Sequence, residues 1–285
     1  MKVEAFAKVN FTLEVFGKRA DGYHALRSVV MPISLSDTLD IEVTDGGEIT
    51  SDTGYDDDLC VKAAKALRNA RLFDCSDCSI VRLKGARISV KKRIPAGGGL
   101  GGGSADAAAV LRALNKLWGV GLSREELAEI GAQVGSDVPA LVLGGPVVME
   151  GRGENVEDLR LKTKDLNLVL VNPGVHSSTK EVYAACEARP LNGEIAMVKM
   201  VAALKAGDLE RIAAALMNDL QAPAVKQHPE IADALVSLRT AGAFGAMMSG
   251  SGSSVFGIVR DAAEAERISS ELTARGLQAW PVQTL

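Results

Sequence analysis

The sequence has few cysteines and histidines, no strong excess of charge and no long apolar run. Its 285 residues include 32 Lys and Arg against 36 Asp and Glu, and a net charge of −4 provides no basic field for nucleic acid. Its longest apolar runs, such as 140–149, are well short of the ~20 residues that span a bilayer. The amino terminus lacks an apolar signal core. We therefore expect a cytoplasmic protein that binds neither nucleic acid nor membrane.

The metal-binding residue types are scattered. Cys75 and Cys78 form a CxxC pair, but no second pair follows at the spacing of a zinc site. Reduced structural thiols are the simpler interpretation. The acidic run 56–58 lacks the ligand spacing of a metal site and is typical of a solvated loop. The sequence therefore predicts neither a zinc site at the cysteines nor a metal site in the acidic run.

Glycine, in contrast, is abundant and clustered. The chain has 29 glycines, whereas an average share of about 7% would give about 20. Six of them fall within residues 97–103, and five more lie from Gly242 to Gly257. Glycine gathers where the backbone approaches another group closely or takes a positive φ. Two ligand-facing loops are therefore expected.

The hydrophobic pattern predicts an α+β fold. Strands come first and helices follow, which favours α+β over regular βαβ repeats. The break at Gly151–Gly153 predicts a boundary between a domain of residues 1–153 and a domain of residues 154–285. Alternation or continuous apolar character predicts strands over 2–16, 28–33, 39–43, 86–94, 166–171 and 254–259, and helical spacing predicts helices over 58–70 and 104–118.

The first glycine cluster lies between a predicted strand and a helix that we expect Ser104 to cap. Backbone N–H groups of such a loop, together with the helix N-terminus, form a site for phosphate. A Walker A loop is excluded because Gly102 is followed by Gly103 instead of lysine. The GxGxxG pattern of a dinucleotide-binding loop is met, but so many glycines meet it by composition alone. The acidic residues that follow begin a helix, whereas a dinucleotide site requires one at the end of a strand, which argues against such a site. A flexible linker would be more polar and richer in serine.

The stretch from Pro95 to Ala105 resembles the phosphate loop of the GHMP kinases, the family of galactokinase, homoserine kinase, mevalonate kinase and phosphomevalonate kinase. Residues 7–10 and 245–254 resemble two further motifs of that family. The resemblance implies a two-domain GHMP-kinase-like architecture with the active site in the cleft between the domains. It implies an ATP-dependent kinase, with Mg²⁺ carried on the ATP phosphates. The implied ATP-binding residues are Lys92, Pro95, Ala96, Gly97, Gly98, Gly99, Leu100, Gly101, Gly102, Gly103, Ser104 and Ala105.

A narrower resemblance concerns the second substrate. The segments 7–10, 19–24, 97–104, 135–139 and 172–175, together with Thr179, resemble the branch of the family that phosphorylates the 2-hydroxyl of 4-diphosphocytidyl-2-C-methyl-D-erythritol, in the non-mevalonate route to isoprenoid precursors. The partner would then be a small molecule with a cytidine diphosphate group. Another kinase of the family, of the homoserine or mevalonate type, and a non-catalytic ligand sensor are the alternatives.

The resemblance implies that Lys8 and Asp137 are the catalytic pair. A carboxylate at the N-terminus of a helix stays ionised and could accept the proton of the acceptor hydroxyl. A lysine beside it would favour a developing alkoxide. From the residue pattern alone, a helix cap for Asp137 and a solvated charge on an edge strand for Lys8 are the simpler interpretations.

The substrate-binding candidates are Asn10, Tyr23, His24 and Thr179. An aromatic face and a polar edge suit stacking and hydrogen bonding to cytosine, which Tyr23 and His24 would supply. Asn10 could hydrogen-bond the substrate, and Thr179 belongs to the substrate-side segment of the resemblance.

Two residues beside the glycine loop keep alternative interpretations. Lys92 either lines the nucleotide site or belongs to a solvated basic run with its neighbours. Ser104 either reaches phosphate or Mg²⁺ or does no more than cap its helix. Ala105 stands where the family more often has a hydroxyl, so a backbone N–H would replace that contact here.

Overall fold

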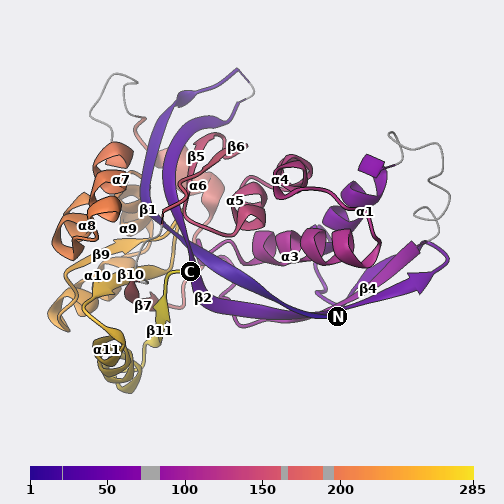
Figure 1. Cartoon of the computed structure of the whole chain (residues 1–285). Helices are drawn as coiled ribbons and strands as arrows, with labels where there is room; N and C mark the ends of the chain where they lie inside the picture. The colour runs from indigo at the N-terminus through magenta and orange to yellow at the C-terminus, as the bar shows by residue number, and fades with distance from the viewer. Residues whose placement is uncertain (21, 72–83, 162–165, 189–195) are drawn as a thin grey trace. The chain divides into compact units, whose positions relative to one another are not determined.

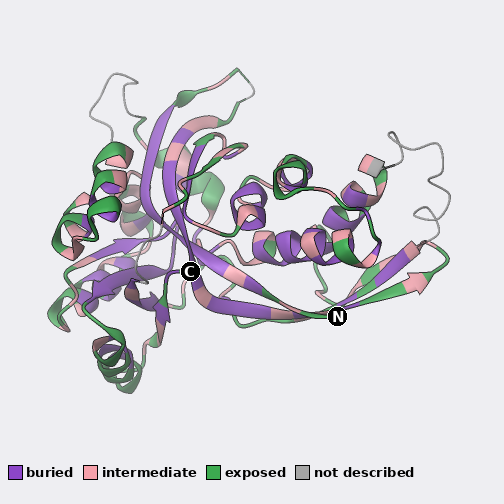
Figure 2. Ribbon diagram, viewed as in Figure 1, coloured by how far each residue is buried: buried purple, intermediate pink, exposed green. Residues whose placement is uncertain are grey.

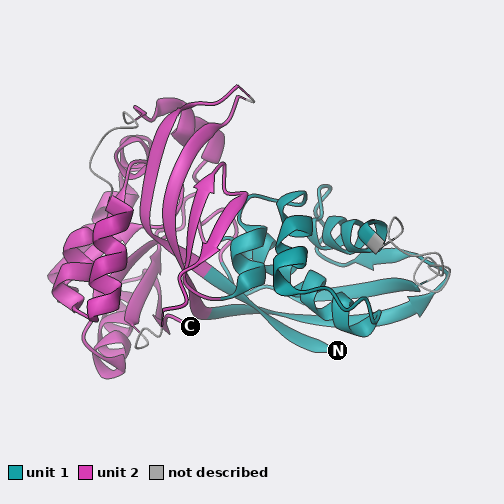
Figure 3. Cartoon of the chain, turned by 45° about the horizontal axis from the view of Figure 1, so that its top comes forward, with its two compact units in different colours: residues 1–7, 35–94, 101–144 teal, residues 8–34, 95–100, 145–285 magenta. Residues whose placement is uncertain are grey.

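The computed structural model describes residues 1–20, 22–71, 84–161, 166–188 and 196–285. The chain folds into two compact units, coloured separately in Figure 3. Unit 1 comprises residues 1–7, 35–94 and 101–144, and unit 2 comprises residues 8–34, 95–100 and 145–285. The units therefore alternate along the chain, whereas the predicted domains are divided once, after residue 153. That division stays a prediction.

Unit 1 is a sheet with helices on one side (Figure 1). Strand β2 pairs antiparallel with β4, from Thr38 opposite Lys91 to Asp45 opposite Lys84, and β4 pairs in parallel with β3. Strands β1 and β2 continue from this unit into the other. The elements are β1 (Lys2–Lys18), β2 (His24–Asp45), β3 (Ile49–Ser51), α1 (Leu59–Arg71), β4 (Lys84–Lys91), α3 (Gly102–Leu117), α4 (Arg124–Ala132) and α5 (Val138–Leu143).

Two strand predictions that involve β2 and β4 need correction, and one buried residue bears on both. The segments predicted at 28–33 and 39–43 form one strand, β2, and the polar Asp37 between them is fully buried. The strand predicted at 86–94 ends at Lys91. The N–H groups of Arg93 and Ile94 instead donate to the Asp37 carboxylate, at 2.5 and 2.8 Å. A buried carboxylate thus takes the place of a strand partner.

Unit 2 contains a second sheet, in the order β11-β7-β10-β9, with antiparallel neighbours. Here β2 also pairs with the β5–β6 hairpin, and β8 pairs in parallel with β1. The remaining elements are β5 (Val147–Gly151), β6 (Asn155–Asp158), β7 (Asn167–Asn172), α6 (Thr179–Ala185), α7 (Ala196–Ala206), α8 (Leu209–Ala215), β8 (Met217–Asn218), α9 (Gln221–Gln227), α10 (Glu230–Thr240), β9 (Gly245–Met248), β10 (Val255–Val259), α11 (Ala262–Ala274) and β11 (Gln278–Gln283).

The second glycine cluster is shorter as a loop than its composition suggests. Residues 245–248 of this cluster form β9, which pairs with β10 from Gly245 opposite Ile258 to Met248 opposite Val255. The loop proper is therefore residues 249–254. Pairing overrides the glycine content here because Ala246, Met247 and Met248 are buried apolar side chains.

Each unit has its own buried core (Figure 2). In unit 2 the rings of Phe11 on β1 and Phe256 on β10 stack with centroids 5.5 Å apart. In unit 1 helix α3 buries four alanines, Ala105, Ala107, Ala108 and Ala109. Small side chains let α3 pack closely against α1, which fixes the helix that follows the first glycine loop.

Candidate active site

The first half of the glycine loop, residues 95–100, belongs to unit 2 and packs tightly against other residues of that unit. A Cβ on Gly99 would overlap the carbonyl oxygen of Ser249, and Gly99 has φ +74. A Cβ on Gly97 would overlap the ring of His176. Glycine is needed at residue 99 because the backbone of Ser249 leaves no room for a Cβ, and it is favoured at residue 97 because φ there is +66.

The second glycine loop holds the first in place. The Ser249 hydroxyl donates to the carbonyl of Gly99 at 3.0 Å, and the N–H of Ser254 donates to the carbonyl of Gly98 at 3.1 Å. The amide of Asn172 supports this contact by donating to the Ser254 hydroxyl at 3.0 Å. Both serines are fully buried. The carbonyls of the loop are thus engaged from within unit 2.

Beyond residue 100 the loop enters unit 1 and becomes helix α3. The N-cap is Gly101, with φ 69, and the helix begins at Gly102. The prediction that Ser104 caps this helix is therefore wrong, because two more glycines wind into its first turn. Ser104 lies inside that turn, where N–H groups without helical partners and the positive end of the helix favour an anion. A Cβ placed on Gly135 would be 3.8 Å from its hydroxyl, so Ser104 lies near the turn that precedes Asp137.

Lys92 is paired with two carboxylates instead of forming part of a solvated basic run. Its ammonium group lies 2.5 Å from Asp37 Oδ2 and 2.7 Å from Asp106 Oδ2. Burial acts to lower the pKa of Lys92, but the hydrogen bonds and charges of Asp106 and Asp37 raise it above its usual range. Its Nζ would lie 3.5 Å from a Cβ on Gly102, at the start of α3. A contact with ATP stays a prediction.

Lys8 and Asn10 lie on β1 and are both buried, so Lys8 is not a solvated edge-strand charge. The Lys8 ammonium donates to Asn10 Oδ1 at 2.8 Å, and the Asn10 amide donates to the Ser28 hydroxyl at 2.7 Å. The backbone N–H of Lys8 donates to the carbonyl of Leu100 at 3.0 Å. Lys8 is therefore held at the end of the glycine loop, and its amine is oriented by a fixed amide.

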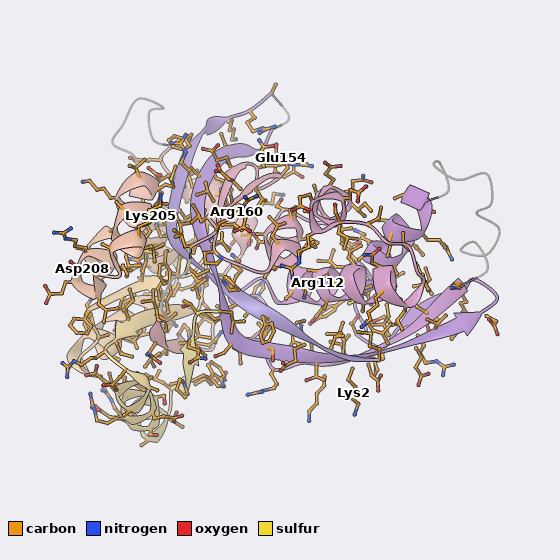
Figure 4. The ribbon with its side chains drawn as sticks, viewed as in Figure 1. Lys2, Arg112, Glu154, Arg160, Lys205 and Asp208 are labelled. Atoms are coloured by element: carbon orange, nitrogen blue, oxygen red, sulfur yellow. The ribbon has the colours of Figure 1, made fainter. Side chains whose placement is uncertain are left out.

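Asp137 is at the N-cap position of α5, as the sequence predicts. Within the described residues, however, its carboxylate makes no capping hydrogen bond to that helix. Arg112 of α3, labelled in Figure 4, donates to the carbonyl of Leu141 at 2.5 Å and ties α5 to α3. Helix α5 is thus anchored near its C-terminal end, and the Asp137 carboxylate does not serve as its N-terminal cap.

Tyr23 and His24 lie where β2 begins, in a group with aromatic and basic side chains. Tyr23 is 56% exposed, and the Arg152 guanidinium lies 5.5 Å from the centre of its ring. The His24 ring lies 5.7 Å from the ring of Tyr183. In the same unit, Arg19 forms an ion pair with Glu154, with 3.1 Å between the guanidinium nitrogen and the carboxylate oxygen. Glu154 is labelled in Figure 4.

Thr179 and Tyr183 are one helical turn apart on α6. The Thr179 hydroxyl lies 2.8 Å from that of Ser251 in the second glycine loop. Sequence reasoning missed Tyr183, although its spacing of four residues from Thr179 places both on one face of a helix. It also singled out neither Ser249 nor His176; Ser249 belongs to the motif at 245–254, but no local pattern shows that either residue contacts the first glycine loop.

The remaining predictions concern metal, thiols and membrane. The Cys75–Cys78 pair lies outside the described residues. Cys60 is buried, and burial raises the pKa of its thiol. Among the described residues no group of three or more His, Cys, Asp and Glu side chains could hold a metal ion. In the described part of the chain, no helix is long and apolar enough to cross a membrane.

A glycine loop that leads into a helix N-terminus, with a buried lysine at its end, is an anion site of the kind that phosphotransferases use. Comparison with known proteins agrees. The N-terminal domain of the GHMP kinases matches residues 58–145, and their C-terminal domain matches residues 200–278. The chain belongs to the GHMP kinase family and is an ATP-dependent phosphotransferase. The predicted α+β fold of that family is confirmed.

Individual relatives are similar over the whole chain. A 4-diphosphocytidyl-2-C-methyl-D-erythritol kinase of Symbiobacterium thermophilum is 40% identical over 100% of both chains, and one of Pelotomaculum thermopropionicum is 44% identical over 93% of this chain and 91% of its own. A crystal structure of 4-(cytidine 5'-diphospho)-2C-methyl-D-erythritol kinase is 32% identical, covers 100% of this chain and 99% of its own, and has a TM-score of 0.83. The mevalonate kinase of Methanococcus jannaschii, 16% identical with a TM-score of 0.71, shares the fold.

Proposed function

We propose that this chain transfers the γ-phosphoryl group of ATP to the 2-hydroxyl of 4-diphosphocytidyl-2-C-methyl-D-erythritol. The observation that carries the proposal is 40% identity over the full length of a relative that bears the name of this kinase. The exposed Tyr23 and the His24–Tyr183 ring pair support it, because homoserine and mevalonate have no base to stack on such rings.

In this reaction the two halves of the glycine loop have different tasks. The carbonyls of Gly98 and Gly99 are bound by serines of the second glycine loop, which fixes the backbone around the loop amides. The first turn of α3 adds N–H groups and positive helix charge toward the ATP phosphates. Ser104 is in this turn, and its hydroxyl is suited to a phosphate or to Mg²⁺. Mg²⁺, carried with ATP, would neutralise charge on the transferring group.

The chemical step needs a proton acceptor and a group that stabilises the alkoxide. The oxygen of the 2-hydroxyl forms a bond to the γ-phosphorus, the bond from that phosphorus to the β–γ bridging oxygen breaks, and the hydroxyl proton passes to Asp137. Lys8, oriented by Asn10, would stabilise the developing negative charge. Positioning and charge neutralisation carry the reaction, so no covalent enzyme intermediate is expected.

A coupled ADP-release assay over a panel of alcohols, with ATP and Mg²⁺, tests the proposal. Diphosphocytidyl-methylerythritol should have the highest kcat/KM, and the same preparation of Asp137→Asn should lose the activity, which excludes a contaminating kinase. Turnover of homoserine or mevalonate without turnover of the cytidine substrate would overturn the substrate. No turnover of any alcohol by a folded, ATP-binding protein would favour a sensor.

A further inference from the structure

A short segment of unit 2, residues 217–221, connects strand β1 to the second glycine loop. Asn218 is its central residue, and all its side-chain hydrogen-bonding groups are engaged. The amide nitrogen donates to the carbonyls of Met248 and Gly250, both at 2.8 Å. The amide oxygen accepts the N–H of Leu220 at 2.9 Å. A single amide group thus binds the carbonyl at the end of β9 and a carbonyl of the second glycine loop.

The other end of this segment is fixed to β1, the strand that carries Lys8 and Asn10. β8 pairs in parallel with β1, with Leu13 opposite Asn218. Asp219 then accepts the N–H of Val15 at 2.9 Å and donates its own N–H to the carbonyl of Leu13 at 3.0 Å. Asn218 is therefore supported by the backbone of the same strand that positions the lysine.

The loop that Asn218 holds borders the reacting groups. A Cβ on Gly250 would lie 2.9 Å from the carbonyl oxygen of Gly99 and 3.4 Å from the ammonium nitrogen of Lys8. Its neighbour Ser249 donates to the same carbonyl of Gly99. A shift of the Gly250 peptide would therefore disturb both the phosphate loop and the surroundings of Lys8.

We propose that Asn218 is a positioning residue for phosphoryl transfer, which fixes the Gly250 peptide against Lys8 and Gly99. The proposal rests on the proposed function, since it assigns Asn218 a role in that reaction. Removing the donor would leave two buried carbonyl oxygens without this hydrogen bond, which is unfavourable. Without the amide nitrogen, the loop would relax away from the geometry that the transfer requires, and small misplacements reduce rates strongly.

Asn218→Asp tests this directly, because it replaces the donor nitrogen with an oxygen of the same size. We expect kcat to fall by about tenfold or more, while the KM for each substrate changes less than about threefold, since the lost contact acts on the reacting geometry more than on binding. Should this variant not fold, Asn218→Ser keeps one donor and should give an intermediate kcat.

Asn115 offers a matched control in unit 1. Its amide nitrogen donates to the carbonyl of Leu122 at 2.9 Å, and its amide oxygen accepts the N–H of Leu122 at 3.0 Å. Asn115→Asp should lower thermal stability with kcat close to wild type. Wild-type kcat in a folded Asn218 variant, or an equal fall of kcat in the Asn115 control, would overturn the role of Asn218. If the proposed function is wrong, the wild-type protein will not phosphorylate the cytidine substrate. The variants would then be compared on the alcohol that the wild type does phosphorylate.

Discussion

Asp106 makes the electrostatics beside the glycine loop measurable without substrate. One carboxylate oxygen accepts from Lys92, whereas the other is buried with no hydrogen-bond partner among the described residues. Burial raises the pKa of Asp106 from 3.8 to about 7, which the nearby Lys92 does not offset. Between these pH values the folded protein holds a proton that the unfolded chain releases. The free energy of unfolding contributed by this group therefore falls as the pH rises from about 4 to 7.

The size of the effect follows from the shift. About three pKa units at 1.36 kcal/mol each give about 4 kcal/mol, an upper value because water and side-chain movement screen the charge. Asp106→Asn removes the titration, keeps the shape and leaves Lys92 paired with Asp37. The unfolding free energy of the variant minus that of the wild type should become more positive by about 2–4 kcal/mol between about pH 4.5 and pH 8.

Urea denaturation followed by circular dichroism over this pH range measures the difference. Asp58→Asn is a control that should not respond in this range: burial acts to raise the pKa of Asp58, but hydrogen bonds from Thr53 and Ser51 and from the backbone of Val61 and Cys60 lower it overall. The stability that Asp58 contributes is present above its unfolded pKa and is lost as the pH falls through its lowered folded pKa. The difference between Asp58→Asn and the wild type should therefore stay nearly constant from about pH 4.5 to pH 8, and an equally constant difference for Asp106→Asn would contradict the raised pKa of Asp106.

Further predictions concern catalysis and binding. Asp137→Asn should lower kcat by a factor on the order of 10², while ATP affinity by calorimetry is kept; near wild-type turnover would remove Asp137 from the mechanism. Gly99→Ala, which places a Cβ against the carbonyl of Ser249, should raise the KM for ATP about tenfold or more, because the phosphate loop must shift; an unchanged KM would contradict the loop assignment. Tyr183→Ala should raise the KM for the cytidine substrate about tenfold through lost stacking beside His24, with the KM for ATP unchanged, and an equal rise in both would indicate a general loss of structure.

The sequence predicted best what depends on neighbouring residues. A strand, a glycine loop and a helix follow one another at 84–117 as expected, since β alternation and helix periodicity are local signals. The cap of α3 was misplaced at Ser104, because glycines that look like loop residues wind into the first turn once Gly101 supplies the left-handed cap.

What could not be predicted depends on contacts between distant segments. Alternation along β1 does not show that Lys8 is buried or that Asn10 orients it, because the burial of a strand face is decided by what packs on it. The roles of Ser249 and Asn218 arise from strand pairing in unit 2, which brings residues over a hundred positions away to the glycine loop and to β1. Such pairs leave no pattern in a single sequence.

The structure of the product tests the substrate assignment most directly. The purified protein would be incubated with ATP, Mg²⁺ and 4-diphosphocytidyl-2-C-methyl-D-erythritol, and the product examined by phosphorus and carbon NMR. The account predicts one new phosphomonoester signal beside an intact diphosphate, with phosphorus coupling at carbon 2 of the methylerythritol. An unchanged cytidine substrate in the presence of active, ATP-binding protein, or a phosphate on another oxygen, would contradict it.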